Sequence, residues 1–242
     1  MANSKMRAII LNAGKGKRMM PLTKDTHKCL LEISGKTILE HQLINLQEVG
    51  VSETIIVTGA FSEKICDFVK SLKLRMKVVT IFNPFYEITE NIVSFWFARD
   101  FLKGKVFIMM GDLLFDKHIL VNLMNKNPYC GLAVHQKDYY EQDDMKVKIK
   151  DGKVKQISKN TRNPNGESLQ ISFYNKYGSS RLKEIIDMII KQGRFYGWYP
   201  EAVQELINED AEVLPIYFED HMWIEIDSLE ELKHARRFTK NG

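Results

Sequence analysis

The sequence lacks several features that mark particular classes of protein. It contains only 3 cysteines, an odd number without a CxxC pair, which argues against a disulfide framework and a zinc cluster. No apolar run approaches the roughly 18 residues of a membrane-spanning helix, and no linker rich in Pro, Gly or Ser and no internal repeat divides the chain. The first residues lack the apolar core of a signal peptide, so we expect a cytoplasmic protein with no membrane partner.

The chain also lacks a strong excess of one charge. The 35 Lys and Arg residues and 31 Asp and Glu residues leave a net charge of +4, and the two signs are interleaved along most of the chain. A nucleic-acid-binding surface is therefore the weakest of the functions that we considered, and we expect no nucleic-acid partner. With 44% hydrophobic residues, the 242-residue chain can form one α/β domain over 1–242, with halves at about 1–127 and 128–242.

A glycine-rich, basic loop follows the first apolar run. Gly14 and Gly16 allow backbone N–H groups to approach phosphate oxygens closely, and Lys15, Arg18 and Lys28 add positive charge. The spacing is neither that of a Walker loop nor that of the dinucleotide fingerprint. In isolation, a solvent-exposed turn explains it equally well. The basic glycine-rich combination suggests a loop that binds a nucleoside triphosphate.

Strands and helices alternate through the first half of the chain. The apolar runs predict strands at 6–11, 53–57, 76–82 and 105–110, and helical spacing predicts helices at 37–50, 61–72 and 116–127. This order predicts βαβ units and a parallel sheet, whose ligand lies beyond the carboxyl ends of the strands. Gly14, Gly59, Asn83 and Asp112 fall at such ends.

The pattern changes in the second half. Alternating runs predict antiparallel strands at 131–136, 145–149, 153–158 and 169–174, and helices are expected at 180–191, 200–208 and 230–238. Ser180 and Pro200 are the expected helix starts. We therefore expect an α/β fold with a Rossmann-like, mostly parallel central sheet flanked by helices, and with a small antiparallel lobe.

Carboxylates follow two of the expected strands. The run 105–110 continues into Gly111-Asp112, which would bring one carboxylate to the open end of the sheet, where a Mg²⁺ on phosphates needs oxygen ligands. Glu225 and Asp227 are two residues apart, which places them on the same face of a strand. The alternative for Asp112 and Asp227 is that each caps a turn or helix.

Together these motifs resemble those of the nucleotidyltransferases that activate sugar phosphates and related alcohol phosphates. The N-terminal signature of that family, Gly-x-Gly-x-Arg-Met/Leu-x-Pro-Leu-Thr followed by Lys-x-Leu, is similar to the stretch from Gly14 to Leu30. Asn12 replaces the usual Ala, and His27 replaces the Pro of the sugar-phosphate members. The Thr26-His27-Lys28 form resembles the phosphocholine cytidylyltransferase branch.

The resemblance implies roles for individual residues. Arg18 would hold the phosphates that leave as pyrophosphate, Lys28 would contact phosphate at the reacting centre, and Asp112 and Asp227 would bind Mg²⁺. An Asn-x-x-Ser element, Asn91 to Ser94, resembles one in the phosphocholine and inositol-phosphate cytidylyltransferases. The expected nucleotide-binding residues are Leu11, Asn12, Ala13, Gly14, Lys15, Gly16, Gly59, Asn83, Asn91, Ser94 and Gly111. For Asn83, a turn before Pro84 is the structural alternative.

The resemblance also implies an acceptor site in the antiparallel lobe. Gly166-Glu167 is similar to a Gly-Glu pair that contacts the acceptor in sugar-phosphate members. The expected acceptor-binding residues are Glu167, Trp198, Tyr199, Trp223 and Glu225. Aromatic side chains, including Phe85 and Tyr86, could hold a quaternary ammonium group by cation–π attraction, or they could be packing residues.

The sequence thus predicts a Mg²⁺-dependent cytidylyltransferase that transfers CMP from CTP to a small phosphorylated or phosphonate alcohol such as phosphocholine. A sugar-1-phosphate uridylyltransferase or thymidylyltransferase and a non-catalytic regulatory module of the same fold are the alternatives. Binding alone would not require Arg18, Lys28, Asp112 and Asp227 together, which argues against the regulatory module. The acceptor group and the oligomeric state stay open.

Overall fold

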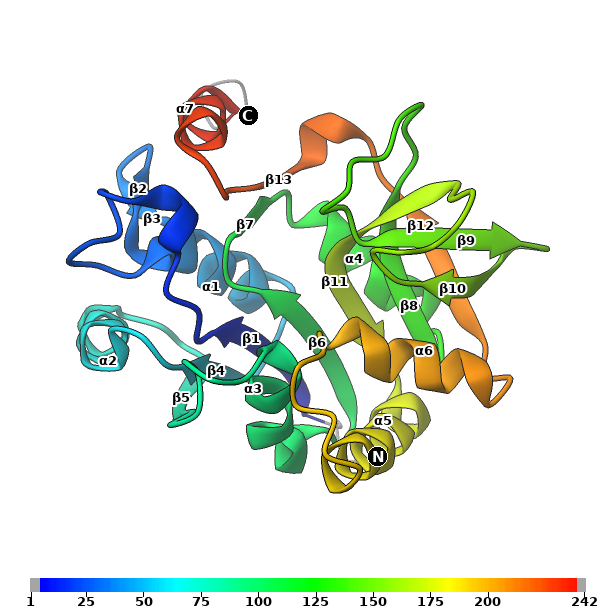
Figure 1. Cartoon of the computed structure of the whole chain (residues 1–242). Coiled ribbons are helices and arrows are strands. Elements are labelled where there is room, and N and C mark those ends of the chain that lie inside the picture. Colours follow the sequence, from blue (N-terminus) through cyan, green and yellow to red (C-terminus); the bar gives the residue numbers. More distant parts are fainter. Residues whose placement is uncertain (1–4, 239–242) are drawn as a thin grey trace.

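The computed structural model describes residues 5–238, and a nine-stranded mixed sheet forms its centre (Figure 1). The strands follow in space as β10 (Lys153–Ile157), β9 (Lys146–Lys150), β11 (Gly166–Tyr174), β6 (Lys105–Met110), β1 (Met6–Asn12), β4 (Glu53–Thr58) and β5 (Lys77–Phe82). Beside this path, β8 (Cys130–His135) pairs with β11, and β12 (Val213–Tyr217) pairs with β8.

The sheet has a parallel half and a mainly antiparallel half. Strand β1 is parallel to both β4 and β6, and β4 is parallel to β5, as expected for βαβ units. Strand β11 is antiparallel to β6, β8 and β9. The expected fold class is confirmed, and the antiparallel strands are hydrogen-bonded directly into the same sheet. The two halves therefore share one continuous surface at the carboxyl end of β6.

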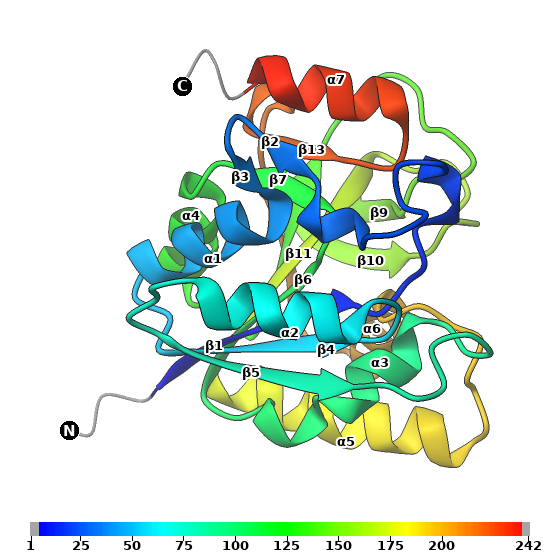
Figure 2. The ribbon, with the colours of Figure 1, turned by 90° about the vertical axis from the view of Figure 1, so that its left-hand side faces the viewer.

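Helices cover both faces of the sheet (Figure 2). On one face lie α1 (Ile38–Glu48), α2 (Ser62–Ser71) and α4 (His118–Lys126), and on the other lie α3 (Asn91–Phe97), α5 (Lys176–Lys191) and α6 (Pro200–Asn208). Because side chains of a strand alternate, Ala8 and Ile10 face the first group while Ile9 and Leu11 face the second. A strand buried on both faces is a continuous apolar run, which is why β1 was predictable.

One helix start differs from expectation. Helix α5 begins at Lys176, and its N-cap is Asn175, whose side chain accepts hydrogen bonds from the backbone N–H groups of Tyr177 and Gly178. The prediction that Ser180 starts this helix is wrong. The Ser180 hydroxyl instead donates to the carbonyl of Lys176 within the first turn of the helix. Asn is as good an N-cap as Ser, so tertiary packing decided between two locally adequate starts.

Two small sheets and the last helix complete the wall above the main sheet. Strand β13 (Trp223–Glu225) pairs with β7 (Leu113–Phe115), β2 (Glu32–Ile33) pairs with β3 (Lys36–Thr37), and α7 (Leu229–Phe238) follows β13. A separate buried cluster ties them to the N-terminal loop through Met19, Ile33, Ile38, Leu114, Ile226, Leu232 and Ala235. The glycine-rich loop and the segment after β13 are thereby held against each other. Within residues 5–238, no helix combines the length and apolarity needed to cross a bilayer.

Candidate active site

Two cavities meet beyond the carboxyl ends of β1 and β6. The first cavity, of about 430 Å³, is lined by the loop after β1, by the start of α3 and by His27 and Lys28. The second cavity, of about 1430 Å³, lies over the antiparallel half of the sheet. Arg18, Asp112 and Asp227 line both cavities, so they stand at the junction between them.

Most of the expected nucleotide-binding residues line the first cavity. They are Leu11, Asn12, Ala13, Gly14, Lys15, Gly16, Asn91 and Ser94. Gly16 has φ of 61°, in the left-handed region that favours glycine. Asn91 is held in place because its side-chain oxygen accepts from the backbone N–H of Tyr199, at 2.7 Å. The loop and the start of α3 thus form two opposing walls.

Three of the expected nucleotide-binding residues do not line this cavity but contact residues that do. They are Gly59, Asn83 and Gly111. A Cβ on Gly59 would lie 2.4 Å from the Ala13 carbonyl oxygen, and a Cβ on Gly111 would lie 1.6 Å from Asn12 Oδ1. Asn83 is fully buried, and its side-chain amide donates to the Ser94 hydroxyl at 3.0 Å. These three residues therefore allow close packing under the cavity wall.

A network of charges occupies the junction. Lys28 Nζ lies 2.6 Å from Asp112 Oδ2 and 2.5 Å from Asp227 Oδ1. Arg18 Nη2 lies 2.5 Å from the other oxygen of Asp227. Burial of the Lys28 ammonium opposes its charge, but the two carboxylates outweigh burial and raise the pKa of Lys28. The sequence placed Arg18 and Lys28 in one loop and Asp112 and Asp227 in two distant segments, and the structure brings the four residues together.

The junction also has a donor set that fits a divalent cation. One carboxylate oxygen each from Asp112, Glu225 and Asp227 can be chosen so that all lie within 4.8 Å of one another. Asp112 Oδ1 is buried and has no hydrogen-bond partner in the described part of the chain. Burial, with the charges of Asp112 and Asp227 adding to it, raises the pKa of Glu225 to about 8. A bound cation would favour the ionised carboxylates, and hard oxygen donors are what Mg²⁺ prefers.

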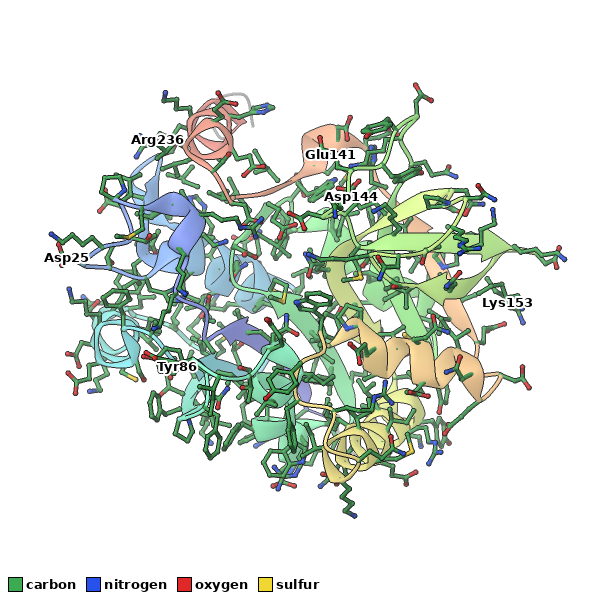
Figure 3. All side chains as sticks on the ribbon, in the orientation of Figure 1. Asp25, Tyr86, Glu141, Asp144, Lys153 and Arg236 are labelled. Carbon is green, nitrogen blue, oxygen red and sulfur yellow. The ribbon has the colours of Figure 1, made fainter. Side chains whose placement is uncertain are left out.

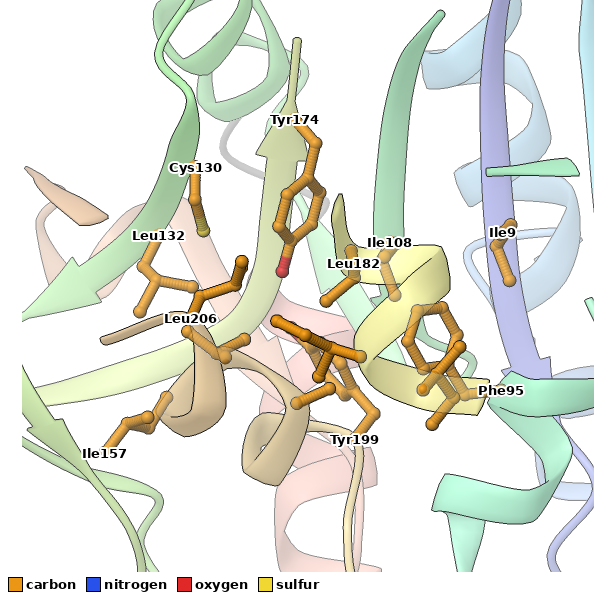
Figure 4. Close-up of a cluster of buried hydrophobic side chains, with 14 of the residues drawn as sticks. Ile9, Phe95, Ile108, Cys130, Leu132, Ile157, Tyr174, Leu182, Tyr199 and Leu206 are labelled. Atoms are coloured by element: carbon orange, nitrogen blue, oxygen red, sulfur yellow. The ribbon is translucent and has the colours of Figure 1, made fainter. Parts of the chain in front are cut away.

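Four of the five expected acceptor residues line the second cavity: Glu167, Trp198, Trp223 and Glu225. Tyr199 does not. Its ring is buried against Phe95, and its hydroxyl lies 3.1 Å from the Ser172 hydroxyl (Figure 4). Tyr199 is the N-cap residue of α6 and faces the core, whereas the adjacent Trp198 faces the cavity.

The other two aromatic candidates lie elsewhere. Tyr86 lines the first cavity, where Lys15 Nζ is 5.9 Å from its ring centre. Phe85 packs on Phe97, with ring centres 6.3 Å apart, and lines neither cavity. The five aromatic side chains considered for one ammonium site are therefore distributed over four different places.

Sequence reasoning missed several residues of the second cavity. Lys137 Nζ pairs with Glu167 at 2.7 Å and with Asp144 at 2.8 Å. Figure 3 shows Asp144 and Glu141 on the segment that joins β8 to β9, above the sheet. Burial raises the pKa of Glu167, and Lys137 opposes that shift. No motif marked these residues, because they belong to an irregular segment whose path depends on the rest of the fold.

His27 and Gln170 were also missed as site residues. His27 lines the first cavity, its Nδ1 accepts from the backbone N–H of Cys29 at 3.2 Å, and burial lowers its pKa to about 4. The only signal in the sequence was that His27 departs from the usual Pro. Gln170 lies inside a strand in which nothing local distinguishes it, yet it lines the second cavity.

Comparisons with known proteins agree with this geometry. Residues 8–241 match the MobA-like NTP transferase domain. The chain is 27% identical to the choline-phosphate cytidylyltransferase of Streptococcus pneumoniae, over 98% of this chain and 99% of that protein. It is 29% identical to the 2-aminoethylphosphonate cytidylyltransferase of Lancefieldella rimae, over 94% of this chain and 91% of that protein.

Solved structures share the fold. The structure of the CTP:phosphocholine cytidylyltransferase from Streptococcus pneumoniae superposes with a TM-score of 0.82 at 24% identity, covering 97% of this chain and 99% of that one. The inositol-1-phosphate CTP transferase from T. maritima superposes with a TM-score of 0.81 at 20% identity, covering 99% and 97%. The chain belongs to the MobA-like NTP transferase domain family, and it is a nucleotidyltransferase.

Proposed function

We propose that the chain is a Mg²⁺-dependent cytidylyltransferase that transfers CMP from CTP to a small phosphorylated or phosphonate alcohol, of which phosphocholine is one example, and releases pyrophosphate. One observation carries this proposal: Arg18, Lys28, Asp112 and Asp227 gather where the two cavities meet. A nucleotide in the first cavity and an acceptor in the second would bring their phosphorus centres together at this junction. The cytidylyltransferases among the relatives support CTP as the nucleotide.

The proposed reaction is an in-line displacement. An oxygen of the acceptor phosphate or phosphonate bonds to the α-phosphorus of CTP, and the bond from that phosphorus to the bridging oxygen breaks, so that both electrons leave with pyrophosphate. A phosphate monoester is already ionised near neutral pH, so the site needs no general base. Lys28 would neutralise charge at the reacting phosphates and Arg18 would hold the departing pyrophosphate, which leaves positioning and charge stabilisation as the sources of catalysis.

Asp112 and Asp227 would hold the Mg²⁺, with Glu225 as a neighbouring carboxylate. When bound, the ion would supply positive charge for the phosphate oxygens. In the structure, Lys28 lies between the two aspartates, so its ammonium keeps the carboxylates close to each other. Arg18 binds Oδ2 of Asp227 and thereby orients Oδ1, the oxygen that faces Lys28.

The charge of the second cavity favours a cationic acceptor. Among its lining residues, acidic side chains outnumber lysines and arginines by eleven to four. The excess negative charge of the cavity attracts a protonated amine, whereas it does not attract an uncharged sugar ring. A sugar-1-phosphate uridylyltransferase or thymidylyltransferase is therefore the second candidate. A regulatory module without turnover is the third, and the complete set of junction charges argues against it.

We further propose that the chain works as a single domain in the cytoplasm, where CTP is available. Residues 1–127 would provide most of the nucleotide site, and residues 128–242 would provide most of the acceptor site. Asp227 is the exception, because it comes from the second half and lies against Lys28 of the first. Both halves would be needed for turnover.

Pyrophosphate release in the presence of Mg²⁺ tests the proposal. CTP, UTP, dTTP, ATP and GTP should each be combined with phosphocholine, 2-aminoethylphosphonate, inositol 1-phosphate and glucose 1-phosphate. We expect turnover with CTP and an alcohol phosphate or phosphonate. Turnover only with glucose 1-phosphate and UTP or dTTP would replace the proposal by the second candidate, and nucleotide binding without any turnover would support the regulatory module.

A further inference from the structure

The backbone of β11 is distorted at Gln170. This residue has φ of 56°, which is uncommon for a residue with a side chain, although it lies inside a strand. The pairing of β11 with β8 shifts register between Ser168 and Ser172, and the Ser168 hydroxyl accepts from the backbone N–H of Gln170 at 3.1 Å. Such irregularities redirect a side chain and gather near functional sites. Here the distortion turns Gln170 into the second cavity.

The side chain of Gln170 holds the carboxylate of Glu225. Its Nε2 lies 3.1 Å from one oxygen of Glu225 and 3.2 Å from the other. Both residues line the second cavity and neither lines the first, whereas Asp112 and Asp227 line both. Glu225 is thus the member of the carboxylate cluster that faces the acceptor side.

Glu225 also has no cation of its own. Lys28 pairs with Asp112 and Asp227, and Lys137 pairs with Glu167, which is the buried glutamate of the cavity. Among the described side chains, which do not include those of His221 and Arg237, no lysine, arginine or histidine forms an ion pair with Glu225. A carboxylate that is held in position and lacks a basic partner is suited to a cationic group of the substrate.

The amide of Gln170 has a fixed orientation when Glu225 is ionised, which is the form that a bound cationic group favours over the protonated one. A carboxylate only accepts hydrogen bonds, so the NH₂ of Gln170 must face it, and the amide oxygen must face away. No side chain or backbone group of the described residues donates to that oxygen. Gln170 Oε1 and the Glu225 carboxylate therefore offer two neighbouring hydrogen-bond acceptors at one place in the cavity.

A trimethylammonium group could use neither acceptor, since it carries no N–H. It is recognised by aromatic faces. Two tryptophans, Trp198 and Trp223, line the second cavity, and the ring of Trp223 lies 6.4 Å from that of His135. Lys159 Nζ lies 4.7 Å from the ring centre of Trp198 and thus occupies a cation position over that ring. Tyr199, the expected neighbour of Trp198, is buried in the core. The cavity is accordingly better built for a hydrogen-bonding ammonium than for a quaternary one.

We infer that Gln170 is a specificity-determining residue: its amide oxygen and the Glu225 carboxylate accept N–H bonds from a primary ammonium group, so the acceptor is a primary aminoalkyl phosphate or phosphonate. This inference rests on the proposed cytidylyl transfer and narrows the acceptor. It concerns recognition only, because Gln170 reaches the head group of the acceptor and not its reacting phosphate.

A methylation series tests the inference. With CTP and Mg²⁺, kcat/KM should be measured for phosphoethanolamine and for its N-methyl, N,N-dimethyl and N,N,N-trimethyl forms, the last of which is phosphocholine. Each methyl group removes one N–H donor. Because a hydrogen bond to a charged group corresponds to a factor of about 10 or more, we expect kcat/KM to fall by at least about tenfold between the first and last members. Phosphocholine as the best acceptor would overturn the inference.

The Gln170→Met variant provides the second arm. Methionine keeps the length of the side chain and places the same demand on the backbone, but it cannot accept the N–H bond or hold Glu225. We expect the preference for phosphoethanolamine over phosphocholine to shrink about tenfold or more, through KM more than kcat. Gln136→Met is the matched control, because Gln136 is exposed, lines neither cavity and donates only to the Asn165 carbonyl.

Two further measurements distinguish a loss of acceptor specificity from a general loss of function. The Kd for CTP, measured without acceptor, and the unfolding temperature should match wild type in Gln170→Met, which shows that the fold and the first cavity are intact. An equal loss with all four acceptors would overturn a specificity role. Turnover with CTP and inositol 1-phosphate, but with no amine, would overturn the inference and leave cytidylyl transfer standing. Turnover confined to UTP or dTTP would overturn the proposed function itself.

Discussion

The Lys28 ammonium lies 2.5 Å from a carboxylate oxygen of Asp227, although 199 residues separate the two along the chain. The contact joins the loop after β1 to the segment after β13, and a buried apolar cluster behind it holds the same two segments together. Both cavities open onto this contact. The pair therefore links a nucleotide site built early in the sequence to an acceptor site built late.

The first prediction concerns the carboxylates at the junction. Asp112→Asn and Asp227→Asn keep the shape of the side chain but remove a charge that the proposed Mg²⁺ needs, so we expect kcat/KM to fall by about 100-fold or more. Pyrophosphate release measures the loss, and circular dichroism checks that the fold is retained. Asp100→Asn affects an exposed ion pair with Lys183, and neither residue lines a cavity, so this variant should keep wild-type activity. An active Asp227→Asn variant would contradict the assignment.

The second prediction is that Mg²⁺ can replace the ammonium of Lys28. Lys28→Met leaves the two aspartate carboxylates without their shared cation, so we expect the metal-free variant to lose roughly 1–3 kcal/mol of unfolding free energy. Added Mg²⁺ should then raise the unfolding temperature of the variant more than that of wild type, because it binds the folded state preferentially. Lys70→Met, which removes an exposed pair with Asp67, is the control. Equal Mg²⁺ shifts in both proteins would disprove the replacement.

The third prediction uses the close approach of Asn12 to Gly111. A Cβ at position 111 would collide with Asn12 Oδ1, so Gly111→Ala should destabilise the protein by about 1–3 kcal/mol. The double variant Asn12→Ala/Gly111→Ala removes the obstacle and should recover part of this loss. Denaturant unfolding of the two single variants and the double variant gives the coupling energy. Additive effects would mean that the two side chains do not meet.

The fourth prediction concerns stability and pH. Glu53 is buried and pairs with Arg7 and Lys77, and its hydrogen bonds to Lys77 and Arg7 keep its pKa below the ordinary 4.5 despite the opposing effect of burial. A carboxyl group whose pKa is lowered by folding contributes stability above its ordinary pKa and loses it as the pH falls through the folded value. Glu53→Gln should therefore cost about 1–3 kcal/mol at pH 7 and progressively less below pH 4.5. Glu32→Gln, at an exposed position, should show little difference at any pH. A pH-independent cost would contradict this account.

The fifth prediction separates two neighbouring aromatic residues. Tyr199→Phe removes only the hydroxyl that meets Ser172 in the core, so we expect a loss of about 1 kcal/mol in stability and no change in acceptor KM. Trp198→Phe changes the wall of the second cavity and should alter acceptor KM with little effect on stability. Unfolding curves and steady-state kinetics on both variants decide the matter. A large KM effect in Tyr199→Phe would contradict the placement of that ring.

Local patterns were sufficient for the elements that carry the phosphate loop. Strand β1 is apolar because both faces of the sheet are covered, and the glycines follow where the strand ends. The position of Asp112 just beyond the buried strand β6 was predictable for the same reason, whereas its proposed metal role came from the family resemblance and stays a prediction. Helix starts were less predictable where two acceptable caps lie close together, as Asn175 and Ser180 do.

The composition of the second cavity was much harder to predict. Gln170 reaches it through a distortion inside a regular strand, and Lys137 reaches it from an irregular segment. Neither feature has a local sequence pattern, because each depends on partners from distant segments. Trp198 and Tyr199 are a further example, because one of these adjacent aromatic residues lines the cavity and the other lies in the core. Only the packing of α6 on the sheet distinguishes them.

The sequence by itself determined the alternation of strands and helices, the glycine loop and the position of Asp112 beyond a buried strand, because periodicity, glycine geometry and strand ends are local properties. Tertiary structure alone decided that Lys28 lies between Asp112 and Asp227, that Gln170 holds Glu225 and that Tyr199 is buried. The physical reason is that these contacts join segments far apart in the chain, and burial and charge neutralisation select their partners only when the whole sheet has formed.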